Sequence, residues 1–332
     1  MDMYVLWIVV FLALAFDFIN GFHDTANAIA TTVSTRALKP RIAILLAAVM
    51  NFVGALTFTG VAATIGKGVA DPSKLEHGVE IVIAALLSAI AWNLITWWFG
   101  IPSSSSHALI GSLMGAVIAG AGIGNVNAEG LKKIITALIA SPLIAFTAGF
   151  IIMWILKLIF AKSSPHQVNK GFRFGQILTA AFQSFSHGTN DAQKAMGIIV
   201  FALVAAGIQD DMSVPMWVKL SAAAAMALGT SIGGWKIIKT MGTKIFKIEP
   251  INGFAADIGS AAVILTATMI HLPVSTTHVI TSSILGVGSA KRFSAVKWGV
   301  AGKIVISWII TIPITILMAM LFFWLIDLFF LA

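Results

Sequence analysis

The feature of this sequence that most constrains its fold is a pair of polar motifs, each of which occurs twice in an otherwise apolar chain. The segment Gly21–Ala28 returns as Gly188–Ala195, and the segment Ile101–His107 returns as Leu272–His278. The two copies of each segment are separated by nearly the same length of chain, about half of the whole. Two motifs that keep nearly one offset predict that the chain consists of two related halves. Polar residues inside long apolar stretches also indicate a functional site at membrane depth.

The composition is that of a membrane protein. Of the 332 residues, 58% are hydrophobic and 10% are charged, whereas about a quarter of the residues in a soluble domain are charged. Several apolar runs can each cross a hydrocarbon core of about 30 Å as a helix of about 20 residues, namely 42–65, 79–99, 134–160 and 298–331. The period-two alternation of an outer-membrane barrel is missing. The fold class that we expect is an all-α polytopic membrane protein.

The distribution of positive charge predicts the orientation of the chain. A net charge of +8 could indicate binding to nucleic acid or to anionic lipid, but the lysines and arginines gather in short connections between apolar runs. The basic connections are 34–41, 162–173, 236–249 and 290–297, and the connections with little positive charge are 67–77, 122–133 and 208–214. The positive-inside rule places the basic set in the cytoplasm. We therefore expect a multi-pass protein of the cell (inner) membrane, embedded in the lipid bilayer, with both termini extracytoplasmic and no nucleic-acid partner.

Matching connections in the two halves carry opposite charge. The basic connection 34–41 corresponds to 208–214, which is acidic, so the two lie on opposite sides of the membrane. An odd number of crossings per half produces such an inverted-topology repeat. We expect five crossings per half, or fewer if either motif forms a re-entrant hairpin, with ten to twelve broken or re-entrant helical segments in all. The predicted units are a first repeat over 1–161, a cytoplasmic linker over 162–175 and an inverted second repeat over 176–332.

The first motif predicts a cation site. An ionised carboxylate at membrane depth costs several kcal/mol unless it is partnered, yet Asp24 and Asp191 occur at matched positions. The glycine that precedes each aspartate favours an unwound helical turn, and the freed carbonyl oxygens together with a carboxylate suit a hard cation. The simpler alternative is that both aspartates are satisfied polar residues between helices. The residues that we assign to the cation are Asp24, Asn27, Asn190, Asp191, Gln193 and Ser103.

The second motif predicts an anion site. A proline followed by hydroxyl residues is typical of a helix start, where free backbone N–H groups and the positive end of the helix dipole attract anions. The alternative is ordinary helix capping, for which one serine would suffice. Lys194 could bind the anion or pair with an aspartate, and we expect His107 and His278 to fix their loops by hydrogen bonds. The residues that we assign to the anion are Ser104, Ser105, Ser106, Ser275, Thr276, Thr277, Thr25 and Lys194.

At these residues the chain resembles the inorganic phosphate transporter (PiT) family. That family carries a Gly-x-Asn-Asp-x-x-Asn-Ala signature in each half and Pro-x-Ser-Thr-Thr-His-like segments. The sequence departs from the signature at His23 and Lys194, each of which replaces an asparagine. The resemblance implies cation-coupled uptake of inorganic phosphate, with Na⁺ as the coupling ion, by a homodimeric carrier that is not an enzyme and needs no cofactor. Because the family resemblance extends to sulfate carriers, it leaves both phosphate and sulfate open as the transported oxyanion.

A charge count favours symport. Two aspartates and a divalent phosphate leave a large negative charge even with Lys194 beside them, and about two or three Na⁺ would neutralise it, because like charges a few Å apart repel by several kcal/mol. We therefore expect sodium-coupled phosphate symport by alternating access at a midplane site. The alternative is a proton-coupled phosphate or sulfate permease of the same architecture. A channel would need a continuous polar stripe, and an intramembrane serine enzyme would not need a duplicated centre.

Overall fold

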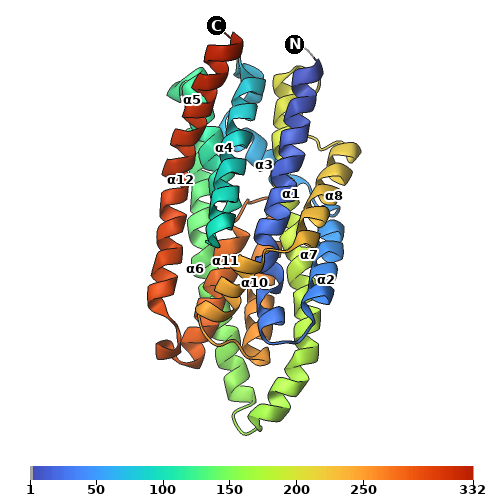
Figure 1. Cartoon of the computed structure of the whole chain (residues 1–332), viewed down its shortest axis with the longest axis vertical. Coiled ribbons are helices and arrows are strands. Elements are labelled where there is room, and N and C mark those ends of the chain that lie inside the picture. Colours follow the sequence, from blue (N-terminus) through green and yellow to red (C-terminus); the bar gives the residue numbers. More distant parts are fainter. Residues whose placement is uncertain (1–2, 332) are drawn as a thin grey trace.

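The computed structural model describes the backbone of residues 3–331, and it describes their side chains except those of Met3, Thr25, Phe330 and Leu331. These residues form twelve α-helices and no strand beyond one isolated bridge (Figure 1). The first six are α1 (Met3–Ser34), α2 (Pro40–Ala55), α3 (Gly60–Val69), α4 (Gly78–Phe99), α5 (Ser105–Ala121) and α6 (Ala128–Ile159). The second six are α7 (Pro165–Ala205), α8 (Met216–Ile232), α9 (Trp235–Lys239), α10 (Pro250–Met269), α11 (Thr276–Lys291) and α12 (Trp298–Ile326).

Short turns complete the chain. A π turn, Thr240–Lys244, follows α9, and another, Asp327–Leu331, follows α12. Single 3₁₀ turns lie at Pro72–Lys74, Ile123–Asn125 and Phe293–Ala295.

The helices have the length and polarity of membrane spans. Among the described residues, α1, α4, α6, α10 and α12 are long and apolar enough to cross a bilayer, and α2 and α3, which meet at a bend of 74°, qualify as one broken span. The fold is therefore the all-α polytopic membrane class that the sequence predicts, with broken helices among its segments. Both chain ends lie at one end of the molecule, and the α6–α7 connection lies at the other end (Figure 1).

The segments α4–α5 and α10–α11 are hairpins that each enter and leave at one end of the molecule. The Asn127 N–H before α6 donates to the Val69 carbonyl at the end of α3, at 2.7 Å, so the two ends of the α4–α5 segment lie together. In the same way, the Lys297 N–H before α12 donates to the Ile245 carbonyl at 2.9 Å. Figure 1 shows α4–α5 in the upper half of the molecule and α10–α11 in the lower half.

The hairpins bear on the expected number of crossings. Among the described residues five helices, or six spans if the bent α2–α3 pair is one, are long and apolar enough to cross a membrane. In Figure 1, α4–α5 and α10–α11 each turn back inside the molecule. This turn favours the re-entrant alternative over five crossings per half. A buried turn is possible because the other hairpin satisfies its backbone: the Ser106 hydroxyl donates to the Val274 carbonyl at 2.8 Å.

The glycines of the first motif do not unwind their helices. Helix α1 continues through Gly21, and α7 continues through Gly188. A Cβ atom on Gly21 would meet the backbone of Met226 in α8, and one on Gly188 would meet the backbone of Asn51 in α2. The prediction of an unwound turn is therefore wrong: these glycines let two helices of opposite halves approach closely, which is how small residues are commonly used in membranes.

The two halves interlock rather than form separate bodies. Helix α6 packs against α11 and α12 packs against α5, while α1 packs against α8 and α2 against α7. The connection between the halves is shorter than the polar segment 162–175, because α7 begins at Pro165 and the Ser164 side chain caps it by accepting from the Gln167 N–H. Pro142 inside α6 and Pro313 inside α12 are separated by the same offset as the second motif.

Candidate functional site

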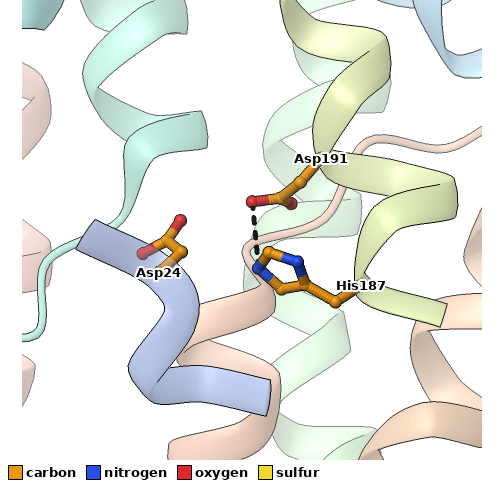
Figure 2. A group of neighbouring side chains, drawn as sticks. All are labelled: Asp24, His187 and Asp191. Carbon is orange, nitrogen blue, oxygen red and sulfur yellow. Dashed lines mark ion pairs between the residues drawn. The ribbon is translucent and has the colours of Figure 1, made fainter. Parts of the chain in front are cut away.

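The centre of the molecule holds a carboxylate from each half. Asp24 of α1 and Asp191 of α7 are buried, and one ligand atom of each lies within 4.8 Å of the other and of a ring nitrogen of His187 (Figure 2). The His187 Nε2 atom lies 3.4 Å from the Asp191 Oδ2 atom. Two carboxylates and an imidazole at such separations form a set of ligands that can hold a cation.

Asp24 is bound by hydroxyl groups from both hairpins. The Ser105 hydroxyl at the start of α5 donates to Asp24 Oδ2 at 2.9 Å, and the Thr277 hydroxyl in the first turn of α11 donates to Oδ1 at 3.2 Å. The Nδ1 atom of the neighbouring His23 lies 2.9 Å from the same Oδ1 atom. The carboxylate is thus held by groups from three helices.

Asp191 has a matching set of partners. The Thr276 hydroxyl of α11 and the Asn20 amide of α1 donate to Asp191 Oδ2 at 3.3 and 3.2 Å. The Lys194 Nζ atom lies 2.8 Å from Oδ1. Ser105 and Thr276 occupy matching positions in the two copies of the second motif, so each hairpin contributes the corresponding hydroxyl to the aspartate of its own half.

The starts of α5 and α11 meet at these aspartates. The Ser104 side chain accepts from the His107 N–H at 3.1 Å, and the Ser275 side chain accepts from the His278 N–H at 3.2 Å, so both serines are N-caps. The earlier N–H groups of each first turn have no partner within the helix. Two positive helix ends therefore converge on the two carboxylates, which gives the site the means to hold an oxyanion and a cation side by side.

The imidazole rings of the second motif mark the junction of the halves. The rings of His107 and His278 lie 4.4 Å apart, and the ring of Trp308 stacks on His278 at 3.8 Å. The His107 Nδ1 atom lies 2.9 Å from the Ser104 hydroxyl, which agrees with the expected role of fixing the loop. For His278 the expected hydrogen bond is not found, because its Nε2 atom has no hydrogen-bond partner among the described residues.

The structure brings together many of the site residues assigned from the sequence. Two of them are Asp24 and Asp191 themselves. Five more contact one of these aspartates directly or through one hydroxyl group: Asn27, Lys194, Ser105, Thr276 and Thr277. Ser104, Ser275 and Ser106 form the helix starts and the contact between the hairpins. The side chain of Thr25 lies outside the described residues.

Three further assigned residues have their hydrogen bonds elsewhere. The Ser103 hydroxyl donates to the Thr96 hydroxyl at 2.9 Å, and the Asn190 amide donates to the Thr268 hydroxyl at 2.9 Å. The Gln193 carbonyl oxygen accepts from the Ala62 N–H at 3.1 Å, in the first turn of α3. These side chains support neighbouring helices, and the hydrogen bonds described for them do not include either aspartate.

Sequence reasoning missed two residues of the centre, Asn20 and His187. They occupy matching positions in the two halves, and each precedes its aspartate by four residues. Residues four apart share one face of a helix, so this spacing was a usable signal. His23 also takes part in the centre, because its ring bridges Asp24 and the Thr96 hydroxyl, with Nε2 at 3.1 Å from the latter.

Comparison with known proteins shows which proteins this chain is similar to. A model of the phosphate transporter family matches residues 20–319. A Bacillus subtilis protein named "Probable low-affinity inorganic phosphate transporter" is 63% identical over 309 residues, which is 93% of each chain. A Rhizobium meliloti protein of the same name is 47% identical over 319 residues, or 96% of this chain and 95% of the relative. A solved structure described as "The sodium-dependent phosphate transporter" superposes with a TM-score of 0.86 at 28% identity and covers 98% of this chain and all of its own.

Proposed function

The chain belongs to the phosphate transporter family, and we propose that it is a sodium-coupled symporter that takes up inorganic phosphate by alternating access at the site between its halves. Its relatives are transporters rather than enzymes, and its apolar helices make it a multi-pass membrane protein. Phosphate transport follows from the family. Sodium coupling and the route of transport are the proposal.

The observation that carries the proposal is the pairing of Asp24 and Asp191 beneath the starts of α5 and α11. A phosphate held by the two helix ends would lie beside two carboxylates, and this arrangement would be strongly repulsive without cations. We assign the cation to the cluster of Asp24, Asp191 and His187, and the phosphate to the hydroxyls and N–H groups of the first turns of α5 and α11. Substrate and cation then bind favourably only together.

Alternating access is supported by the arrangement of the two halves. The contacts are paired, with α1 on α8 and α7 on α2, and the hairpins enter from opposite ends. These are the features expected of an inverted-topology repeat with units near 1–161 and 176–332, in which one repeat rocks against the other around a fixed site. The residues assigned to the cation and to phosphate lie on the surface that the repeats share, so such a movement would open the site to either side.

The orientation is part of the same proposal. The basic connections 34–41 and 290–297 lie at the end of the molecule that holds the α6–α7 connection, and both termini lie at the opposite end. The positive-inside rule places the basic end in the cytoplasm of a bacterial inner membrane. The homodimer that the resemblance implies stays a prediction.

The test is phosphate uptake by the purified protein in liposomes at fixed pH. We expect uptake to collapse when external Na⁺ is replaced by choline. Uptake that persists in choline and follows an imposed proton gradient would favour the proton-coupled alternative. Competition by arsenate and sulfate under the same conditions measures oxyanion selectivity.

One observation supports that alternative. Asp17 in α1 is buried, and neither of its carboxylate oxygens has a hydrogen-bond partner among the described residues. An unpaired buried charge is costly, so a proton or a cation has to accompany this carboxylate. If Asp17 carries the coupling proton, Asp17→Asn removes the response of uptake to the proton gradient. If the coupling Na⁺ is held at Asp24, Asp191 and His187 and Asp17 only carries a proton that stays bound, the same variant keeps its response to Na⁺.

A further inference from the structure

Lys194 breaks the symmetry of the two motifs at the site. It follows Asp191 by three residues, as Asn27 follows Asp24. A neutral amide in the first copy is therefore a cationic side chain in the second. Lys194 is among the largest fully buried side chains of the described chain, with 1% of its surface exposed.

The ammonium group of Lys194 contacts both halves of the site. Its Nζ atom lies 2.8 Å from Asp191 Oδ1 and donates to the Ser105 hydroxyl at 2.8 Å. Ser105 in turn donates to Asp24 Oδ2 at 2.9 Å. A carboxylate oxygen and a hydroxyl oxygen, both buried, are ligands that a sodium ion would take in this position.

The corresponding position in the first half has no fixed charge. The Asn27 amide donates to the Thr277 hydroxyl at 2.9 Å, and Thr277 donates to Asp24 at 3.2 Å. The hydrogen bonds described for Asp24 thus come from neutral hydroxyls and from the His23 ring, and the Lys194 ammonium is linked to this carboxylate through Ser105. A mobile cation is needed on the Asp24 side, whereas the Asp191 side already holds a positive charge that cannot leave.

On the basis of the proposed function, we propose that the Lys194 ammonium is a tethered replacement for one coupling cation, so that this chain binds one Na⁺ fewer per phosphate than a site with asparagine in both motifs. A lysine ammonium is a compact charge with three donors, and it can occupy the place of a small ion between oxygen ligands. The exchangeable Na⁺ then lies between the ligand atoms of Asp24, His187 and Asp191, which are within 4.8 Å of one another. Lys194 contributes its charge in every step of the cycle and is not counted in the coupling stoichiometry.

The test compares Lys194→Asn, which restores the residue of the first motif, with Lys194→Arg, which keeps the charge. Phosphate uptake in proteoliposomes is measured against external Na⁺ at fixed pH and saturating phosphate. We expect the Na⁺ Hill coefficient of Lys194→Asn to exceed that of the wild type by about one. Each doubling of a sub-saturating Na⁺ concentration should then raise uptake by a factor that is about two times larger in the variant than in the wild type. Lys194→Arg should keep the wild-type coefficient. Equal coefficients in the wild type and Lys194→Asn would overturn the proposal.

A binding measurement keeps the test decisive if Lys194→Asn transports poorly. Na⁺ bound per purified protomer is counted by equilibrium dialysis with a radioactive sodium tracer in the presence of phosphate, after thermal melting has verified folding. We expect one additional Na⁺ in Lys194→Asn and none in Lys194→Arg, and the same count in all three proteins would refute the replacement. If Lys194→Asn does not fold, Lys194→Gln takes its place in the same comparison.

The two proposals fail in different experiments. Sodium-coupled transport fails if wild-type uptake is unchanged in choline. The replacement of a cation by Lys194 fails if the neutral variant gains no Na⁺, whatever ion drives the wild type.

Discussion

At the scale of single residues, the account depends on two carboxylates that share a buried centre. Each is held by hydroxyls from hairpin helices and by side chains of its own long helix, so its charge is organised before any ligand arrives. Hydrogen bonds to charged groups are worth about 1.5–3 kcal/mol each. We therefore expect that neutralising either aspartate affects the coupling of Na⁺ to phosphate transport more than other substitutions at the site.

We predict that Asp24→Asn lowers Na⁺-driven phosphate uptake at least about tenfold, which corresponds to about 1.4 kcal/mol. The amide keeps the shape of the side chain but removes the negative charge that holds the cation. Uptake of labelled phosphate into proteoliposomes checks this result. The matched control is Asp71→Asn, because Asp71 lies in an exposed connection and pairs with Ser73 and Lys74; a comparable loss there would mean that the assay reports general damage.

At the scale of helices, close packing rather than unwinding explains the repeated glycines. A Cβ atom at Gly188 would overlap the backbone of Asn51, whereas one at Gly171 near the start of the same helix meets nothing within 4 Å. The two positions separate the effect of packing from that of helix propensity.

We predict that Gly188→Ala destabilises the protein by about 1–3 kcal/mol, because α7 must move away from α2. Gly171→Ala should be neutral or should stabilise by about 0.5–1 kcal/mol, because alanine is the better helix former. Thermal melting in detergent, monitored by loss of the helical signal, compares the two variants. Equal melting temperatures would contradict the close approach of α7 and α2.

The hairpin starts carry a second prediction at this scale. Ser275→Ala removes the N-cap of α11 and should cost about 1 kcal/mol of stability. Because α11 presents Thr276 and Thr277 to the aspartates, the same variant should also weaken phosphate binding. Ser289→Ala is the control, since Ser289 lies near the other end of α11 and its hydroxyl donates to the Leu285 carbonyl of the same helix. A variant at Ser275 that behaves like the one at Ser289 would show that the cap has no part in the site.

The sequence predicted the elements that depend on local chemistry. Charged residues in an apolar chain identified Asp24 and Asp191, and the proline–serine pattern located the starts of α5 and α11. It could not decide whether the run 79–99 crosses the membrane or turns back, because both outcomes need the same apolar length. Nor could it tell whether Gly21 breaks α1, since that depends on Met226, which lies in the other half of the chain. His187 was missed because its contact with Asp191 follows from helical spacing and not from the repeated motif.

At the scale of the whole molecule, the proposal requires that the two hairpin tips become exposed to opposite sides in turn. The chain contains no cysteine, so a single introduced thiol can report accessibility without a background. Ile101→Cys lies just before the serine segment of the α4–α5 tip. We predict that a membrane-impermeant thiol reagent modifies it from one side more slowly when Na⁺ and phosphate are both present than with either alone. Equal modification rates under all conditions would contradict coupled occlusion.

The central claim is that Na⁺ and phosphate bind as one unit at the carboxylates and helix starts shared by the halves. Its most direct test is calorimetric titration of the purified protein with phosphate, at fixed pH and ionic strength, in Na⁺ and in choline. The account predicts that phosphate binds at least about tenfold more tightly in Na⁺ and that phosphate tightens Na⁺ binding by the same factor, as thermodynamic linkage requires. Phosphate affinity that is equal in Na⁺ and choline would contradict it.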